Sequence, residues 1–586
     1  MKHSVLKSVL IMMVLSSTCT MAAQQKPNVL VVLLDDVGFM DFGSFGGDTA
    51  TPNIDKLAQQ GVKFSRFYTA PQCAPSRAML MTGKDNHQVG IGSIIESLDP
   101  ALRQYPAYSM IWENDTKTMA SRLKASGYQT FVSGKWGIGE SGANLPSKFG
   151  FDRSFVLDAT GASNYDQRPY IPINTSAKWF EDGERTTLPD DFYSSRNLVD
   201  KLIGYIDDSQ SEQPFFAYLP FMAIHMPVQV PKEYIEKYNG VFDQGWDVMG
   251  KQRLQKAIDL KLVPSDTKLA KALKTNRKWD QLPEQEKAYW ARAMQVNAGM
   301  LEAADFHLGR LLARLEAKGQ LDNTLVIVTS DNGPEGSTVG FEKGLNGAMF
   351  GAWMSMYDWS TEFEDMGGKN GLTTIGPEWA AVSSGPFKLF KFNSSEGGQR
   401  VPLIISGSGI INQTDFLQGR AHMVDVLPTI LDVLDIPYDQ DELYGRSLMP
   451  LINGQSQQVY GADEPYAIEV GGNASLYRGD WKIARVNLPS GDGQWHLFNL
   501  ALDAGEANAL EDEYPVLFQA LLNEYLAYAA EMGVIQPNLD SNVKAQITKN
   551  MIRKQWGLIG PTFICIVALI VALILGLVYL RRRKTA

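Results

Sequence analysis

The sequence predicts an α/β protein with a large mixed, mostly parallel sheet between layers of helices. Two short runs carry this prediction, because Val29–Leu34 and Leu325–Val328 are uniformly apolar and rich in Val, Leu and Ile. Such runs are typical of strands buried on both faces of a sheet. Amphipathic helical segments, among them 284–318, lie between the runs. Strands that alternate with helices indicate a sheet of this kind.

The expected elements have ends that suit them. Thr51 and Pro52 are typical of a helix start, and Gly61 is typical of the end of that helix. Three more segments, YQTFVSGK, PFFAYLP and VPLIISG, are apolar enough to be strands of the same sheet. Near the C-terminus, YAIEV, SLYRGDWKIARV and WHLFNL predict a smaller antiparallel sheet.

The two ends of the chain predict export and membrane anchoring. Residues 1–23 combine two lysines, an apolar run and small residues, as in a secretory signal peptide. Residues 556–580 carry no charge and precede the basic tail 581–586, which predicts a transmembrane helix with a cytoplasmic tail. We therefore expect a periplasmic or extracytoplasmic protein anchored in the cytoplasmic membrane by this helix. A processed sorting tail is the alternative.

Between these ends we expect two domains and a linker. The catalytic α/β domain is expected over 26–437, a smaller subdomain over 438–532, and a polar linker over 533–555. The net charge of −11 argues against binding of nucleic acid or another acidic polymer by the general surface. An anionic substrate would therefore need a local basic pocket.

Polar residues follow several of the expected strands. They are Asp35, Asp36, Lys135, His225, Asp331 and Asn332. Ligands of open α/β sheets bind beyond the carboxyl ends of the strands, so these side chains are expected at one edge. Carboxylate and amide oxygens suit Ca²⁺ or Mg²⁺ rather than Zn²⁺. Adjacent aspartates also need a cation to offset their repulsion, so the set predicts an anion-binding metal centre.

Cys73 is the only cysteine between the two ends of the chain. Cys19 lies in the leader and Cys565 in the apolar tail, so Cys73 has no partner for a disulfide. On the residues alone it is a buried bystander, a reactive thiol or a modified residue. It lies in PQCAPSRAMLMTG, between two prolines and shortly before Ser76 and Arg77.

The segment CAPSR with the following MLMTG resembles the signature C-x-P-S-R-x-x-x-x-T-G of type I sulfatases, the formylglycine-dependent family of the alkaline-phosphatase-like superfamily. The likeness runs from about Asn28 to about Leu510 and is closest to bacterial arylsulfatases. Further motifs follow in the order of the family: DDVG, GKWGIG, AIHMP, SDNG, KFNSSEGGQRVP and WHLFNLALDAGEANAL. The resemblance implies that a formylglycine-generating or other sulfatase-maturation enzyme converts Cys73 to formylglycine (3-oxoalanine).

The resemblance also implies a role for each site residue. One divalent cation, Ca²⁺ with Mg²⁺ as the alternative, would be held by Asp35, Asp36, Asp331, Asn332 and the modified Cys73. Arg77 and Lys135 would offset charge around the metal and the hydrated aldehyde. His225 and Lys391 would donate a proton to the leaving alcohol. One hydroxyl of the hydrated aldehyde would attack sulfur, and the other would release sulfate.

One position departs from the family pattern. The family has G-K-W-H-x-G where this chain has GKWGIG, so Gly137 replaces a histidine thought to deprotonate the second hydroxyl. His87, in GKDNHQVG shortly after the signature, is the candidate substitute, and packing or capping in a loop is its alternative role. Water is the other substitute, at a rate cost of about 10²–10⁴-fold.

The predicted function is hydrolysis of an aryl or alkyl sulfate to sulfate and an alcohol or phenol, with a small-molecule sulfate ester as substrate. Two alternatives stay open. One is a phosphodiester or phosphonate monoester hydrolase of the same superfamily, and the other is a catalytically impaired, membrane-tethered binding protein, for which Gly137 is the only evidence. Segment 334–390, rich in glycine and aromatic residues, is expected to form the rim that selects the alcohol part.

Overall fold

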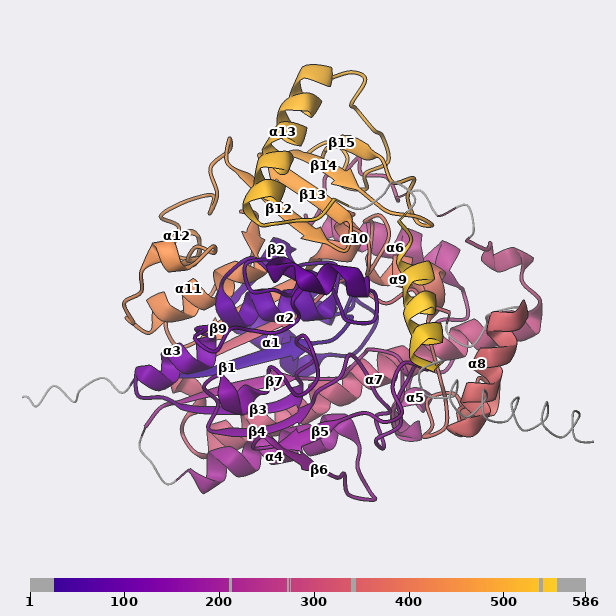
Figure 1. The fold of residues 1–586 in the computed structure, drawn as a ribbon, viewed down its shortest axis with the longest axis horizontal. Helices are drawn as coiled ribbons and strands as arrows, with labels where there is room; N and C mark the ends of the chain where they lie inside the picture. The colour runs from indigo at the N-terminus through magenta and orange to yellow at the C-terminus, as the bar shows by residue number, and fades with distance from the viewer. Residues whose placement is uncertain are drawn as a thin grey trace, which may run out of the picture.

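The computed structural model describes residues 26–555 apart from 210–212, 271–272, 274–275, 339–343 and 537–540. As predicted, these residues form a mixed α/β fold with a large sheet and a small antiparallel sheet (Figure 1). In spatial order the strands of the large sheet are β10 (Phe416–Leu417), β2 (Val62–Tyr68), β9 (Arg400–Gly407), β8 (Thr324–Ser330), β1 (Asn28–Leu34), β7 (Phe215–Pro220), β3 (Gln129–Lys135), β4 (Arg153–Leu157), β5 (Trp179–Glu181) and β6 (Glu184–Thr186), with β11 (Ala421–His422) pairing β2.

Strand β1 lies in the middle of the large sheet and is buried on both faces. It pairs in parallel with β7 on one side and β8 on the other. Leu30 and Val32 pack into one hydrophobic core, and Val29 and Val31 pack into a second one. Side chains alternate between the two faces of a strand, so a strand covered on both faces needs an uninterrupted apolar run. The apolar run in the sequence therefore predicted the position of β1 correctly.

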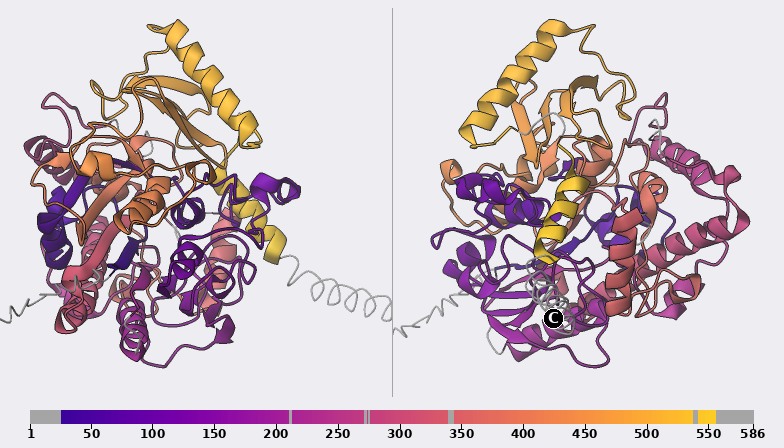
Figure 2. Two further views of the ribbon diagram at one scale, coloured as in Figure 1. Left: turned by 90° about the vertical axis from the view of Figure 1, so that its left-hand side faces the viewer. Right: turned by 45° about the vertical axis from the view of Figure 1, so that its right-hand side comes forward.

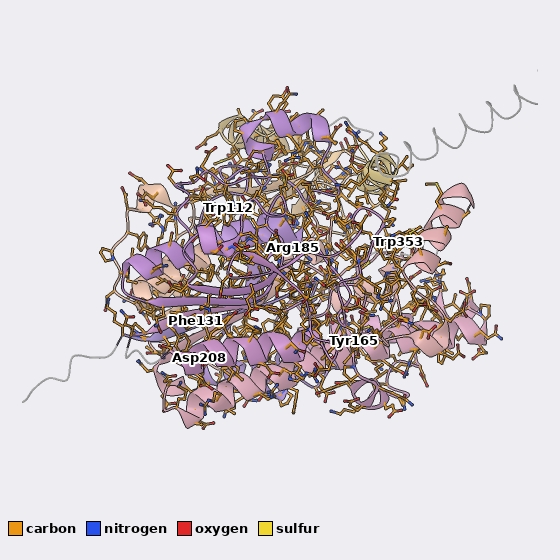
Figure 3. All side chains as sticks on the ribbon, turned by 60° about the horizontal axis from the view of Figure 1, so that its bottom comes forward. Trp112, Phe131, Tyr165, Arg185, Asp208 and Trp353 are labelled. Atoms are coloured by element: carbon orange, nitrogen blue, oxygen red, sulfur yellow. The ribbon has the colours of Figure 1, made fainter. Side chains whose placement is uncertain are left out.

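Helices cover both faces of this sheet. The core on one face takes side chains from α1 (Pro52–Gln60), α4 (Ser194–Asp208) and α7 (Glu284–Ala317). The core on the other face takes them from α2 (Cys73–Thr82), α3 (Met119–Ala125) and α11 (Val426–Val433). Figure 3 shows Phe131 of β3 on the face that α4 covers, where its ring lies 6.1 Å from that of Tyr205. The remaining helices are α5 (Lys232–Glu236), α6 (Trp246–Asp259), α8 (Gly344–Met356), α9 (Gly376–Ser383), α10 (Glu396–Gln399) and α12 (Met449–Ile452).

The small sheet and its helix lie at the top of Figure 1. Its antiparallel strands are β12 (Pro465–Val470), β13 (Asn473–Arg478), β14 (Trp481–Arg485) and β15 (Trp495–Asn499), and α13 (Pro515–Glu531) packs on one face. Lys482 of β14 joins this sheet to the main body, because its Nζ lies 3.0 Å from Glu396 Oε1 of α10 and 2.8 Å from Glu506 Oε1.

Residues 543–555, expected within a polar linker, form a helix in the structure. Figure 2 shows this helix running from the small sheet down the side of the main body. We call it the C-terminal helix.

The membrane anchor in the predicted fold and localisation is corrected. Among the residues that the structure describes, no helix is both long and apolar enough to cross a bilayer. The segment for which the span was predicted, 556–580, lies outside those residues, and so does the predicted signal peptide over 1–23.

Candidate active site

Four neighbouring strands, β8, β1, β7 and β3, end at one edge of the large sheet, and the predicted polar residues lie there. Asp35 and Asp36 follow β1, Asp331 and Asn332 follow β8, Lys135 ends β3, and His225 lies in the loop after β7. All six side chains are buried. Asp36 has a φ of 65°, a left-handed conformation that is uncommon for a residue other than glycine. Such backbone strain is frequent at functional sites.

Arg77 ties the ends of three of these strands together. Its Nε donates to Asp331 Oδ2 at 2.9 Å, and its Nη1 donates to the Lys135 carbonyl oxygen at 2.5 Å. Its Nη2 lies 3.6 Å from Asp35 Oδ1. Burial alone would raise the pKa of Asp331, but Arg77 and the two nearby lysines outweigh it and hold that pKa below its usual value. Asp331 is therefore ionised.

Two buried lysines neutralise the aspartates that follow β1. Lys135 Nζ donates to Asp35 Oδ2 at 2.5 Å, and Lys391 Nζ lies 2.7 Å from Asp36 Oδ1. Glu335 also lies 3.4 Å from Lys391 Nζ. Burial alone would lower the pKa of Lys391, but Asp36 and Glu335 raise it well above its ordinary value. Lys391 therefore keeps its proton at neutral pH.

His225 is neutral and lies next to Asp36. Its Nδ1 donates to the Met226 carbonyl oxygen at 2.5 Å, and its Nε2 lies 3.8 Å from Asp36 Oδ2. Burial and the charges of Lys135 and Lys391 hold the pKa of His225 well below its ordinary value. With its proton on Nδ1, the imidazole presents Nε2 to the site as a hydrogen-bond acceptor.

Cys73 begins α2, one helical turn before Arg77, and its side chain is 1% exposed. Residues one turn apart share a face of a helix, so the thiol and Arg77 face the same side. Burial raises the pKa of the thiol, although the charges of Lys135 and Lys391 act in the opposite direction. Only the thiolate is strongly nucleophilic, so an unmodified Cys73 is a weak nucleophile here.

The donor set fits a divalent cation. Asp35, Asp36 and His225 can place one ligand atom each within 4.8 Å of one another. Two buried oxygens, Asp35 Oδ1 and Asn332 Oδ1, accept no hydrogen bond from any residue that the structure describes. Burial and the neighbouring carboxylates raise the pKa of Asp35 to about 8, against the pull of Lys135 and Arg77. A cation would relieve this repulsion and satisfy both free oxygens.

The structure places His87 away from this group, between the main body and the small sheet. Its Nδ1 lies 3.1 Å from Asp85 Oδ1, and its Nε2 lies 2.7 Å from Glu469 Oε2 of β12. Burial alone would lower the pKa of His87, but both carboxylates raise it to about 9. An imidazole that is protonated and has a carboxylate close to each ring nitrogen cannot accept a proton, so we do not retain His87 as the candidate base.

His87→Gln is expected to destabilise the fold and to remove part of its pH dependence. A raised pKa in the folded state means that this interaction stabilises fully below about pH 6.5 and is lost as the pH rises through about 9. Breaking a buried ion pair costs about 3–5 kcal/mol, so the loss should be of this size at pH 6. Urea unfolding between pH 6 and 9 measures it.

The control variant for this measurement is His307→Gln. Burial and Arg310 lower the pKa of His307 to about 4, so this histidine does not titrate between pH 6 and 9. The control should keep the pH dependence of the wild type. An equal pH dependence in His87→Gln and in the wild type would contradict the assignment of a buried imidazolium.

Glu96, which the sequence prediction missed, lies on the same cavity as Gly137. Both residues line a cavity of about 520 Å³, and Glu96 is 3% exposed. Its Oε1 accepts a hydrogen bond from Thr160 Oγ1 at 2.6 Å, while its Oε2 has no hydrogen-bond partner among the described residues. Thr160 Oγ1 also lies 3.0 Å from the Tyr170 hydroxyl, and the Tyr170 ring lies 5.2 Å from the His225 ring. Glu96 lies in no recognisable motif, so no pattern in the sequence indicated it.

The residues that line this cavity lie outside the segment expected to form the rim. The lining residues fall within 95–103, 137–141, 158–160, 173–178 and 550–554, and none of them comes from 334–390. Segment 334–390 instead contributes Glu335, Thr374 and Ile375 to a much smaller pocket beside Asp36. Gly137 lines the large cavity, and a Cβ added at Gly137 would lie 3.4 Å from Lys135 Cε.

Comparison with known proteins agrees with this geometry. The family model for sulfatases matches residues 27–436, so the chain belongs to the sulfatase family. It is 34% identical over 533 residues to an uncharacterized sulfatase of Schizosaccharomyces pombe, and the alignment covers 88% of this chain and 95% of the relative. It is 33% identical over 445 residues to the arylsulfatase of Klebsiella aerogenes, which covers 75% of this chain and 93% of that enzyme.

Solved structures share the fold at lower identity. Ps i-CgsB in complex with k-i-k-neocarrahexaose has a TM-score of 0.62 at 21% identity, covering 91% of this chain and all of the other. BT4656 in complex with D-glucosamine-2-N,6-O-disulfate has a TM-score of 0.57 at 20% identity, covering 87% and 98%. With the family established, the protein is a sulfuric ester hydrolase, and the reaction it catalyses is the hydrolysis of sulfate esters.

Proposed function

We propose that this protein hydrolyses aryl or alkyl sulfate esters with a formylglycine made from Cys73 and one divalent cation, Ca²⁺ in first place. The observation that carries the proposal is the place of Cys73. A buried thiol with a raised pKa begins the helix that bears Arg77, and Arg77 contacts Asp331 at the edge of the sheet. Because Cys73 is 1% exposed, a maturation enzyme would have to modify it before the chain folds.

The chain would hold both groups with residues already described. Asp35, Asp36, Asp331 and Asn332 would bind the cation, together with an oxygen of the modified Cys73. When bound, the cation and the hydrated aldehyde supply a Lewis acid and an acidified hydroxyl nucleophile. Arg77 and Lys135 hold their positive charges at this edge of the sheet, where the substrate sulfate would bind.

Lys391 is the proposed proton donor to the leaving alcohol oxygen. It is charged at neutral pH, and the loop that bears it is fixed, because Phe392 N donates to the Pro71 carbonyl oxygen at 2.8 Å. That bond holds the loop against the segment that precedes Cys73. His225 takes a supporting part, since its Nε2 accepts rather than donates a hydrogen bond.

Glu96 is the proposed proton acceptor during sulfate release. A Cβ added at Gly137 would lie 3.4 Å from Lys135 Cε, so the side chain that the family has here would start beside that lysine. Gly137 leaves this space open, and Glu96 lines the same cavity with a free, buried Oε2. Burial raises the pKa of Glu96, against a weaker effect of Lys135 and Lys391, and so makes it a stronger base than an exposed glutamate.

Glu96→Gln is expected to lower kcat by about 10²–10⁴-fold, the usual size of a lost general base. Glutamine keeps the oxygen that accepts from Thr160, so the fold should be retained. Steady-state kinetics on phenyl sulfate from pH 5 to 9 measure the change, and the acidic limb of the wild-type profile should vanish in the variant. Glu140→Gln, which changes an exposed carboxylate of the same cavity, is the control. An unchanged pH profile in Glu96→Gln would remove Glu96 from the mechanism.

The proposed substrate class is tested by comparing esters of one alcohol. Matured protein should hydrolyse phenyl sulfate with a kcat/KM well above that for phenyl phosphate and phenylphosphonate monoesters. A higher kcat/KM on the phosphorus esters would contradict the proposal.

A further inference from the structure

The C-terminal helix forms one wall of the large cavity. Asn550, Arg553 and Lys554 line the cavity from this helix, and Gly137 and Thr160 line the same cavity. Asn550 Nδ2 donates to the carbonyl oxygens of Glu96 and Leu98, both at 2.8 Å. The helix is therefore hydrogen-bonded directly to the segment that carries Glu96.

Apolar contacts fix the helix against the main body. Ile547 and Met551 pack on a cluster formed by Tyr170, Ile171, Ile173 and Met226. Met551 also packs on a second cluster, formed by Phe350, Trp353, Trp359 and Leu372. Trp353, a residue of α8, is labelled in Figure 3. A helix that joins two buried clusters is a fixed part of the cavity wall.

The cavity contains cationic side chains that form no ion pair with any described residue. Of its acidic residues, Glu140 pairs with Arg103, Asp158 accepts from Gly142 N at 2.6 Å, and Glu96 accepts from Thr160 through one of its two oxygens. Arg553 and Lys554 are exposed and form no ion pair with any residue in the described part of the chain. Lys178 also lines the cavity and forms no ion pair with any described residue, although its charge acts to lower the pKa of Asp158.

We propose that Arg553 and Lys554 bind a second anionic group on the alcohol part of the substrate. The preferred substrates are then sulfate esters whose alcohol carries another sulfate or a carboxylate. Gly137 lines the cavity, and a Cβ added there would lie 3.4 Å from Lys135 Cε, so an ester whose sulfate lies at the sheet edge would extend its alcohol part into the cavity. Its volume of about 520 Å³ is that of a site for a small molecule. The inference rests on the proposed function and names the substrate class for the same site.

The test uses full-length, matured protein and two substrates, phenyl sulfate and benzene-1,4-diyl disulfate. For the wild type, kcat/KM should be higher for the disulfate. Arg553→Ala and Lys554→Ala should each lower kcat/KM for the disulfate about tenfold, through KM, because a hydrogen bond to a charged group is lost. The same variants should change kcat/KM for phenyl sulfate less than twofold.

Lys549→Ala is the matched control, because Lys549 is exposed on the same helix but does not line the cavity. It should leave both substrates unaffected. Equal losses on both substrates, or no loss on the disulfate, would overturn the inference and leave the proposed function standing. A matured wild type that hydrolyses neither sulfate would overturn both.

Discussion

Cys73→Ala is expected to abolish sulfate-ester hydrolysis while the protein stays folded. Removing the nucleophile of a hydrolase costs about 10⁴-fold or more in kcat. Alanine fits the space of the buried side chain, and Cys73 lies at the first turn of α2, where it makes no ion pair. Activity on phenyl sulfate and thermal unfolding, measured on the same preparation, separate lost chemistry from lost structure.

The control for this experiment is Ala74→Gly, the next residue of α2, which is also buried. It perturbs the same helix turn but leaves Cys73 in place, so most activity should remain. A Cys73→Ala protein with more than about 1% of the wild-type kcat would contradict a nucleophile at this position, because the expected loss is about 10⁴-fold.

Removal of divalent cations is the second large effect that we expect. Chelation should bring hydrolysis to background and lower the stability of the protein, because the buried carboxylates after β1 and β8 then lack a cation to offset their repulsion. Returning Ca²⁺ at about 100 times its dissociation constant should restore about 2.7 kcal/mol of stability. Thermal unfolding with and without Ca²⁺ measures this independently of activity.

Asp36→Asn and Asp158→Asn separate the cation site from a general effect of calcium. Asp36 is one of the proposed cation ligands and contacts Lys391 and a second proposed ligand, Asn332. Its variant should therefore lose most of the stabilisation by Ca²⁺. Asp158 is buried on the cavity but accepts from Gly142 N, outside that set. Its variant should respond to Ca²⁺ as the wild type does. Equal responses in both variants would place the cation elsewhere.

The sheet and the residues at its edge could be predicted because they follow local rules. A strand buried on both faces needs a continuous apolar run, and β1 and β8 have one. The polar residue after such a strand falls at the edge where α/β proteins bind ligands. Asp35 and Asp331 therefore carry a readable signal, although they are far apart in the sequence.

Other parts of the site depend on contacts between segments far apart in the sequence, and no sequence pattern predicted those contacts. His87 is held by Glu469 of the small sheet, and Glu96 is held by Thr160 and the C-terminal helix. The partner of each residue is set by the tertiary fold, which hydrophobic periodicity does not encode. For the same reason the cavity is lined by 550–554 rather than by 334–390.

The mass of the tryptic peptide 67–77, FYTAPQCAPSR, from protein matured in its native system tests most directly whether Cys73 becomes formylglycine. We expect a peptide lighter by about 18 Da than the unmodified sequence, which is the change from thiol to aldehyde. An unmodified thiol in active protein would contradict it, because burial makes Cys73 a weak nucleophile as a thiol.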